Sequence, residues 1–201
     1  TVEEAANTAV ALYEEERGRK QNQMPESEEE KADTYVATIP DLVAAGCSEI
    51  RDLGQPTAIQ KRVEGDIGVG VPLVGYLDLE YEDRVIDVKV VGQMPSSIET
   101  VKNGMLRQMA FYRHATGKPV YLLFIAKPPK NKSHTGFKLI EVPEELLREG
   151  LHQLQTGARA LLQNICLGDS IEDMARFTVP NFDSYMWDEI LRKEAAEVWA
   201  A

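Results

Sequence analysis

The sequence predicts an α/β fold in which a mixed central β-sheet is flanked by helices. Segments with helical periodicity stand at both ends of the chain, five strand-like segments lie between them, and one helix interrupts those strands after the third. The 201 residues are 43% hydrophobic, enough to build the core of one domain. No apolar run reaches the roughly 18 residues of a membrane span, so we expect a cytoplasmic protein without a membrane partner.

The elements follow from apolar spacing and from turn residues. Alternating or continuous apolar runs predict strands over residues 58–66, 72–81, 84–91, 120–126 and 137–142. Apolar residues at helical spacing predict helices over residues 3–17, 34–51, 98–116, 143–167 and 182–201. We divide a single domain, residues 1–201, into a helical part (1–55), a sheet with one helix (56–142) and C-terminal helices (143–201).

Local signals set the ends of several elements. The polar stretch 18–33, which contains Pro25, predicts a loop, and Pro40 fits the first turn of the helix that follows. Gly46 is expected to interrupt that helix. Glu82 and Asp83 predict a tight turn that joins the second and third strands as a hairpin. Ser96 or Ser97 is a candidate N-cap for the helix over 98–116, and Gly117 is its stop signal.

The distribution of charge is more informative than its total. A net charge of −11 on its own argues against a nucleic-acid partner. Residues 84–138, however, contain ten Lys or Arg and only two acids, whereas the remainder holds twelve basic and thirty-one acidic residues. This pattern indicates either one surface that faces a polyanion or a solvated basic face.

The cysteines and histidines exclude several kinds of site. Only Cys47 and Cys166 are present, far apart in the chain, so we expect neither a zinc ribbon nor an iron–sulfur cluster. The three histidines do not fall at metal-ligand spacing. No nucleophile-elbow, Walker or dinucleotide-binding motif is present.

Two acids and a lysine on the predicted hairpin carry the main functional signal. Asp78 lies within the second strand, and Asp87 and Lys89 lie two apart on the third, so both project from one face. Two carboxylates among apolar strands need compensation, which a divalent cation provides. With a lysine to stabilise a developing anion, the set suits metal-assisted phosphodiester hydrolysis. A structural ion-pair cluster is the alternative.

The following helix adds Gln108 and Tyr112, which are four residues apart and therefore share one face. They are either part of the same site or ordinary helix residues.

These motifs together resemble a known enzyme family. The segments VGYLDLEYEDRVIDVKVVG, QMAFY and VYLLFIAKP are similar to the RecB-like branch of the PD-(D/E)XK nucleases, which includes phage lambda exonuclease and the CRISPR adaptation nucleases. The pattern of that branch is G-x-x-D, D-x-K and Q-x-x-x-Y. It matches residues 75–78, 87–89 and 108–112, and the likeness covers residues 58–127 well.

The resemblance implies a fold, an activity and a site. It implies a restriction-endonuclease-like fold and a metal-dependent DNA exonuclease in end processing or recombination, of phage or prophage origin. Asp78, Asp87 and the backbone carbonyl of Val88 would bind Mg²⁺ or Mn²⁺, with Lys89 as the catalytic lysine. Gln108 and Tyr112 would shape the site and contact DNA. Linear duplex or single-stranded ends would be the substrate, and a single-strand annealing protein is a candidate partner.

One family feature is not evident. Relatives often carry an upstream helix with a G-x-x-x-H or G-x-x-x-E motif that adds a metal ligand, whereas residues 7–11 align with alanine in that position. The run Glu14, Glu15 and Glu16 could serve instead, or could form a solvated helix face. Glu64 is either a further ligand or a surface carboxylate. A missing ligand would favour a nuclease-like DNA-binding module without cleavage; an endonuclease is a third alternative.

The candidate DNA contacts are a group of basic residues. They are Arg107, Arg113, Lys127, Lys130 and Lys132. Three of these belong to a basic loop over 127–134 that contains two prolines and suits phosphate contact. Tyr185 and Trp187 could stack on a base or pack the last helix. The sequence leaves the oligomeric state open.

Overall fold

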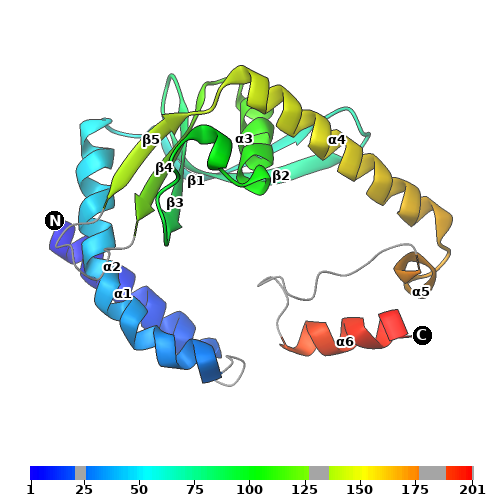
Figure 1. The fold of residues 1–201 in the computed structure, drawn as a ribbon, viewed down its shortest axis with the longest axis horizontal. Coiled ribbons are helices and arrows are strands. Elements are labelled where there is room, and N and C mark those ends of the chain that lie inside the picture. The colour runs from blue at the N-terminus through cyan, green and yellow to red at the C-terminus, as the bar shows by residue number, and fades with distance from the viewer. Residues whose placement is uncertain (21–25, 127–135, 177–188, 201) are drawn as a thin grey trace. The chain divides into compact units, whose positions relative to one another are not determined.

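The computed structural model describes residues 1–20, 26–126, 136–176 and 189–200 (Figure 1). The helices are α1 (Val2–Lys20), α2 (Glu26–Asp52), α3 (Asn103–Thr116), α4 (Glu144–Leu167), α5 (Ile171–Ala175) and α6 (Glu189–Ala200), with a 3-10 turn η1 (Ile98–Thr100). The strands are β1 (Ala58–Asp66), β2 (Pro72–Glu80), β3 (Val85–Val91), β4 (Val120–Ala126) and β5 (Phe137–Glu141). Among the described helices, none is both long and apolar enough to cross a bilayer.

The chain divides into two compact units, residues 1–153 and residues 154–201. The division falls within α4, so the first unit contains the whole sheet and the second contains the end of α4 with α5 and α6. All the candidate site residues that the structure describes belong to the first unit.

The five strands form one mixed sheet in the order β1-β2-β3-β4-β5. The pairs β1–β2, β2–β3 and β4–β5 are antiparallel, and β3–β4 is parallel. The predicted tight turn at Glu82 and Asp83 joins β2 to β3, closed by a hydrogen bond from the Tyr81 N–H to the Arg84 carbonyl at 2.8 Å. Helix α3 is the crossover between the two parallel strands. The predicted α/β fold with a mixed sheet flanked by helices is confirmed.

One face of the sheet is covered by α2. The buried side chains Leu79, Ile86, Leu123 and Ile125 form a cluster against which α2 residues pack. A Cβ atom at Gly46 would lie 2.7 Å from Ile125 Cδ1, so this glycine lets α2 approach β4 closely. The expectation that Gly46 interrupts the helix was wrong, because the missing side chain serves packing between elements.

Helix α3 packs beside the candidate site and buries Leu106, Met109, Ala110, Phe111 and Tyr112. Helix α4 packs closely against α3 at Gly150, where a Cβ atom would lie 3.0 Å from the Leu106 carbonyl oxygen. The sheet and α3 therefore form a tightly packed frame.

Two helix starts differ from the sequence prediction. Helix α2 begins at Glu26 rather than residue 34, which places Pro40 inside the helix instead of in its first turn. The predicted loop over 18–33 is wrong for residues 18–20, which belong to α1, and for residues 26–33, which belong to α2. Packing of α2 on α1 explains this: Ala32 is fully buried, and Arg17 bonds Asp33 at 2.9 Å.

Helix α3 begins at Asn103 rather than residue 98. Thr100 Oγ1 donates to the Ser97 carbonyl at 2.8 Å and closes η1 as a separate turn. Val101 is then extended, with φ −73° and ψ 137°, which interrupts the helical backbone. Helix α3 therefore begins only at Asn103.

Candidate active site

The strand ladder between β2 and β3 ends where the two acids meet. Its only paired residues are Leu79 with Ile86 and Glu80 with Val85. Continuing this register by one residue would set Asp78 opposite Asp87, but the strands separate there. The Asp78 carboxylate takes over the pairing, because its Oδ2 accepts a hydrogen bond from the Val88 N–H at 2.8 Å. The Asp78 side chain thus connects β2 to β3 at the point where the strands separate, which we call the fork.

Asp78 is held from the other side by Gln60 of β1. Gln60 faces Asp78 in the β1–β2 register, and its Nε2 donates to Asp78 Oδ1 at 2.7 Å. Gln60 has a φ of 51°, the one positive value at a described residue other than glycine, and the ladder is interrupted there. Sequence reasoning missed this residue, because glutamine carries no signal for left-handed backbone, unlike glycine, asparagine or aspartate.

Asp87 is a buried carboxylate with incomplete compensation. It is only 1% exposed, and its Oδ2 lies 2.6 Å from Lys89 Nζ. That oxygen nevertheless has no hydrogen bond of good geometry. Burial raises the pKa of Asp87; the ion pair with Lys89 opposes this rise, and the charge of Asp78 adds to it. The two carboxylates are therefore close enough to repel each other.

A chain of hydrogen bonds links the lysine to α3 and back to β2. Lys89 Nζ donates to Gln108 Oε1 at 2.9 Å, and Gln108 Nε2 donates to the Tyr112 hydroxyl at 2.9 Å. That hydroxyl donates to the Tyr76 carbonyl at 2.6 Å. Burial, together with the charges of Asp87 and Asp78, raises the pKa of Tyr112, so the phenol keeps the proton that it donates.

Gly75 explains why α3 can come so close to β2. A Cβ atom there would lie 2.7 Å from Tyr112 Cε1 and 2.9 Å from Phe111 Cε1. The Tyr112 ring cannot move aside without breaking its bonds to Gln108 and the Tyr76 carbonyl. The glycine of the G-x-x-D motif is thus required for packing that positions the lysine.

Val88 adds a backbone group to the site. Its N–H points to Asp78, and in an extended strand the carbonyl of the same residue faces the same neighbouring strand. The Val88 carbonyl and the two carboxylates therefore offer hard oxygen donors around one place. Asp87 and Asp78 carry two negative charges and Lys89 supplies one positive charge, so a divalent cation fits this donor set.

The proposed additional acidic ligands lie elsewhere. Glu64 faces Val74 in the β1–β2 register and pairs with Arg62 at 2.7 Å. It is four residues along β1 from Gln60, or about 13 Å in an extended strand. No group of three His, Cys, Asp or Glu able to hold a metal occurs within residues that the structure describes.

The three consecutive acids of α1 form ion pairs with arginines of the same helix. Glu14 lies 3.7 Å from Arg17, Glu15 lies 2.5 Å from Arg19, and Glu16 lies 3.7 Å from Arg19. Among the contacts of the described residues, α1 packs on α2, and the structure does not bring these carboxylates to the pair on the hairpin.

Two of the candidate DNA contacts are engaged with α4. Arg107 Nη1 donates to Gln153 Oε1 at 3.3 Å, and Arg113 forms an ion pair with Glu144 at 2.7 Å. Arg113 also donates to the Gly117 carbonyl. Lys127, Lys130, Lys132, Tyr185 and Trp187 lie outside the described residues.

A second buried acid stands beside the site with a different role. Glu80, only 7% exposed, pairs with Lys61 at 2.6 Å and with Lys118 at 2.9 Å. These bonds, that of Lys61 foremost, lower its pKa. Because two ammonium groups already neutralise it, Glu80 is a structural carboxylate that ties β1 and the start of β4 to β2. Sequence reasoning assigned it no role.

Comparison with known proteins supports the fold. No protein-family model matches the chain, and no curated protein matches its sequence. The crystal structure of the "Putative exonuclease" of Eubacterium rectale is similar, with a TM-score of 0.55 and 13% identity over 96% of this chain and 74% of that chain. This likeness shows a shared fold. The structure of SSO0001 has a TM-score of 0.38 at 16% identity over 75% of each chain, too low to support a common fold.

Gly75→Ala is expected to destabilise the protein by about 1–3 kcal/mol, because the added methyl overlaps the fixed rings of Phe111 and Tyr112. Urea denaturation of the variant and the parent measures this loss. Gly65→Ala on β1 is the matched control: its Cβ would lie 3.6 Å from the nearest atom, which is ordinary contact. Equal stability of the two variants would contradict the packing argument.

Asp78→Ala is expected to accelerate hydrogen exchange at the Val88 amide, because the N–H loses its acceptor at the strand fork. A lost hydrogen bond worth about 1–3 kcal/mol corresponds to roughly tenfold to hundredfold faster exchange. NMR measures the rates residue by residue. The Val85 amide, which bonds the Pro119 carbonyl at 2.9 Å, is the internal control and should keep its rate.

Proposed function

We propose that this protein is a metal-dependent deoxyribonuclease, an exonuclease of the RecB-like PD-(D/E)XK class that acts in DNA end processing or recombination. The observation that carries the proposal is the buried Asp87, set beside Asp78 and paired with Lys89. A buried carboxylate next to another is costly unless a function retains it.

The arrangement of the three motifs supports this function. Residues from G-x-x-D, D-x-K and Q-x-x-x-Y are distant in sequence, yet hydrogen bonds and packing join them through Gly75, Lys89 and Tyr112. The similar fold of the Eubacterium rectale protein, which carries the name "Putative exonuclease", agrees with the proposal.

The site residues would have three roles: metal binding, stabilisation of charge and positioning of the lysine. Asp78, Asp87 and the Val88 carbonyl would hold Mg²⁺ or Mn²⁺, which when bound polarises the phosphate and acidifies an attacking water. Lys89 would stabilise the added negative charge on the phosphate or orient the water. Gln108 fixes Lys89, and Tyr112 fixes Gln108.

Incubation of end-labelled linear duplex with Mg²⁺ or Mn²⁺ is expected to release nucleotides from the ends and to spare closed circular DNA. Lys89→Ala should lower the rate at least about a hundredfold, because it removes the group that meets the developing charge. The variant should stay folded by circular dichroism, although its melting temperature falls because the buried Asp87 loses its ion-pair partner.

Lys31→Ala, on the exposed surface of α2, is the control and should cleave at the parental rate. Intact linear DNA under every metal and salt condition, with folded protein, would overturn the proposal. Cleavage of closed circles would instead identify an endonuclease.

Mg²⁺ or Mn²⁺ is expected to raise the melting temperature by about 5–10 °C at a hundredfold excess over Kd. Asp87→Asn should abolish this rise, because an amide is a weak ligand. The rise should shrink as pH falls: burial raises the pKa of Asp87, so its carboxylate protonates and leaves the metal at a higher pH than an ordinary aspartate would.

Without metal, the contribution of Asp87 to the free energy of unfolding should change with pH in the opposite direction. The contribution of Asp87 to stability is fully present below its unfolded pKa and is lost as pH rises through its raised folded pKa. Calorimetry with and without metal, from about pH 3, below the ordinary aspartate pKa of about 3.9, to about pH 8, measures both trends. A metal-induced shift that is independent of pH would contradict this assignment.

A DNA-binding module without cleavage is the second candidate. The observation in its favour is that the described residues contain no third acidic or histidine ligand near the pair. It would bind DNA in a salt-sensitive manner without turnover. Phage origin and a single-strand annealing partner stay predictions from the resemblance.

A further inference from the structure

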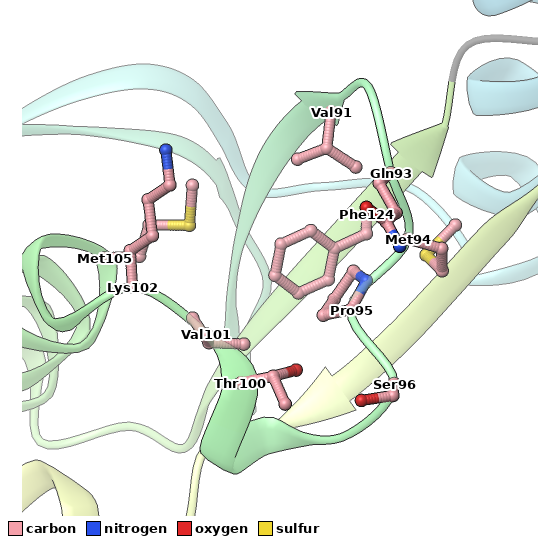
Figure 2. A pocket seen from close by; sticks show the side chains of 10 residues that line it. All are labelled: Val91, Gln93, Met94, Pro95, Ser96, Thr100, Val101, Lys102, Met105 and Phe124. Atoms are coloured by element: carbon pink, nitrogen blue, oxygen red, sulfur yellow. The ribbon is translucent and has the colours of Figure 1, made fainter.

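A pocket of about 370 Å³ opens beside the candidate active site (Figure 2). It lies between the end of β3, the segment after it and the start of α3. Figure 2 shows Phe124 at its centre, with Val91, Val101 and Pro95 around the ring. This volume falls within the range of about 300–1,000 Å³ that is usual for sites that bind small molecules.

The pocket continues the surface that carries the lysine. Phe124 is the register partner of Lys89 in the β3–β4 ladder, and Val91 follows Lys89 by two residues on the same sheet face. Met105 precedes Gln108 by three residues on α3 and so lies on the same side of the helix. The pocket also stands at the carboxyl ends of two parallel strands, where α/β sheets bind their ligands.

The wall of the pocket is fixed by bonds from β5. Lys138 Nζ donates to the Pro95 carbonyl at 3.3 Å and to the Ser96 carbonyl at 2.9 Å. The turn η1 follows directly, closed by Thr100 onto Ser97. The segment from β3 to α3 is therefore held in place, and the pocket is formed before any ligand enters.

The lining has the chemistry of a site for a flat heteroaromatic ring. Met94 and Met105 are partly exposed and supply apolar contact, and methionine sulfur favours aromatic rings. Val101 and Phe124 also line the pocket but are buried. The exposed Gln93 offers both a donor and an acceptor. None of the ten lining residues is acidic, which disfavours a cation.

Among the ten lining residues, Lys102 is the one with a cationic side chain. Lys102 is exposed beside Met105, and among the described residues no acid pairs with it. It is placed to attract a phosphate linked to the ring in the pocket, since lysine contacts phosphate as a point charge.

We infer that this pocket receives a nucleobase of the DNA strand whose phosphate lies at Asp78, Asp87 and Lys89, with Lys102 contacting a neighbouring phosphate. The inference rests on the proposed function and adds the means by which the site holds a nucleotide. The base leaves its stack and exchanges stacking on other bases for contact with the partly exposed Met94 and Met105, since Phe124 is only 2% exposed and offers little surface.

Methyl NMR tests the pocket without DNA cleavage. The protein is labelled with ¹³C at its methionine methyls and titrated with dAMP and, separately, with inorganic phosphate. The Met94 and Met105 methyl signals should shift with dAMP and not with phosphate. Met109, fully buried on the same helix, is the internal control and should not move. Equal shifts with phosphate, or none with dAMP, would overturn the inference.

A second experiment places the pocket relative to bound DNA. Binding of short DNA is measured in EDTA, with an abasic residue at each of the positions nearest the end in turn. One abasic position should weaken binding about tenfold, since stacking of a base on protein contributes about 1–3 kcal/mol. Met105→Trp and, separately, Met94→Trp should fill the pocket and remove this sensitivity.

The two tryptophan variants, read out by DNA binding and by DNA cleavage, distinguish failure of the pocket assignment from failure of the nuclease proposal. DNA binding that is indifferent to abasic residues would overturn the pocket while leaving the nuclease proposal intact. Base sensitivity with no cleavage in any metal would support the pocket and favour the module without turnover. Sensitivity that persists in both tryptophan variants, once near-ultraviolet circular dichroism shows them folded, would overturn the assignment of this pocket.

Discussion

The hydrogen bond from the Val88 N–H to the Asp78 carboxylate is the constraint on which the site depends. It lets β2 and β3 separate while both strands stay ordered, because the partly buried amide keeps an acceptor. Without that separation, Asp78 and Asp87 would be an ordinary cross-strand pair of like charges, which is unfavourable. The fork instead gives the Asp78 carboxylate a hydrogen-bond partner at the point where the ladder between the strands ends.

The sheet was predictable because its strands combine apolar runs with clear turns. The bounds of β1 and β4 agree with the prediction, and those of β2, β3 and β5 differ by one residue at an end. Helix starts were less predictable: the acidic residues 26–30 read as a loop, although packing between α1 and α2 makes this stretch helical. The break before α3 depends on a local turn at Thr100, which competes with the helix.

For the site, spacing along the hairpin was sufficient to group Asp78, Asp87 and Lys89. The link to Gln108 and Tyr112 needed the family pattern, because helical spacing alone does not say which face meets the sheet. Glu64 could not be excluded by sequence, since its distance from Asp78 depends on strand register. The group of basic residues was the least informative, because Arg107 and Arg113 have partners on α4 that no local pattern reveals.

The left-handed backbone at Gln60 restricts what this position can accept during evolution. A β-branched residue would be disfavoured there by its conformation, and any side chain without a donor would leave Asp78 Oδ1 without its partner. Asparagine tolerates the conformation more readily but is one methylene shorter. Drift at this edge-strand position is therefore limited by two independent requirements, although the residue lies outside every motif of the family.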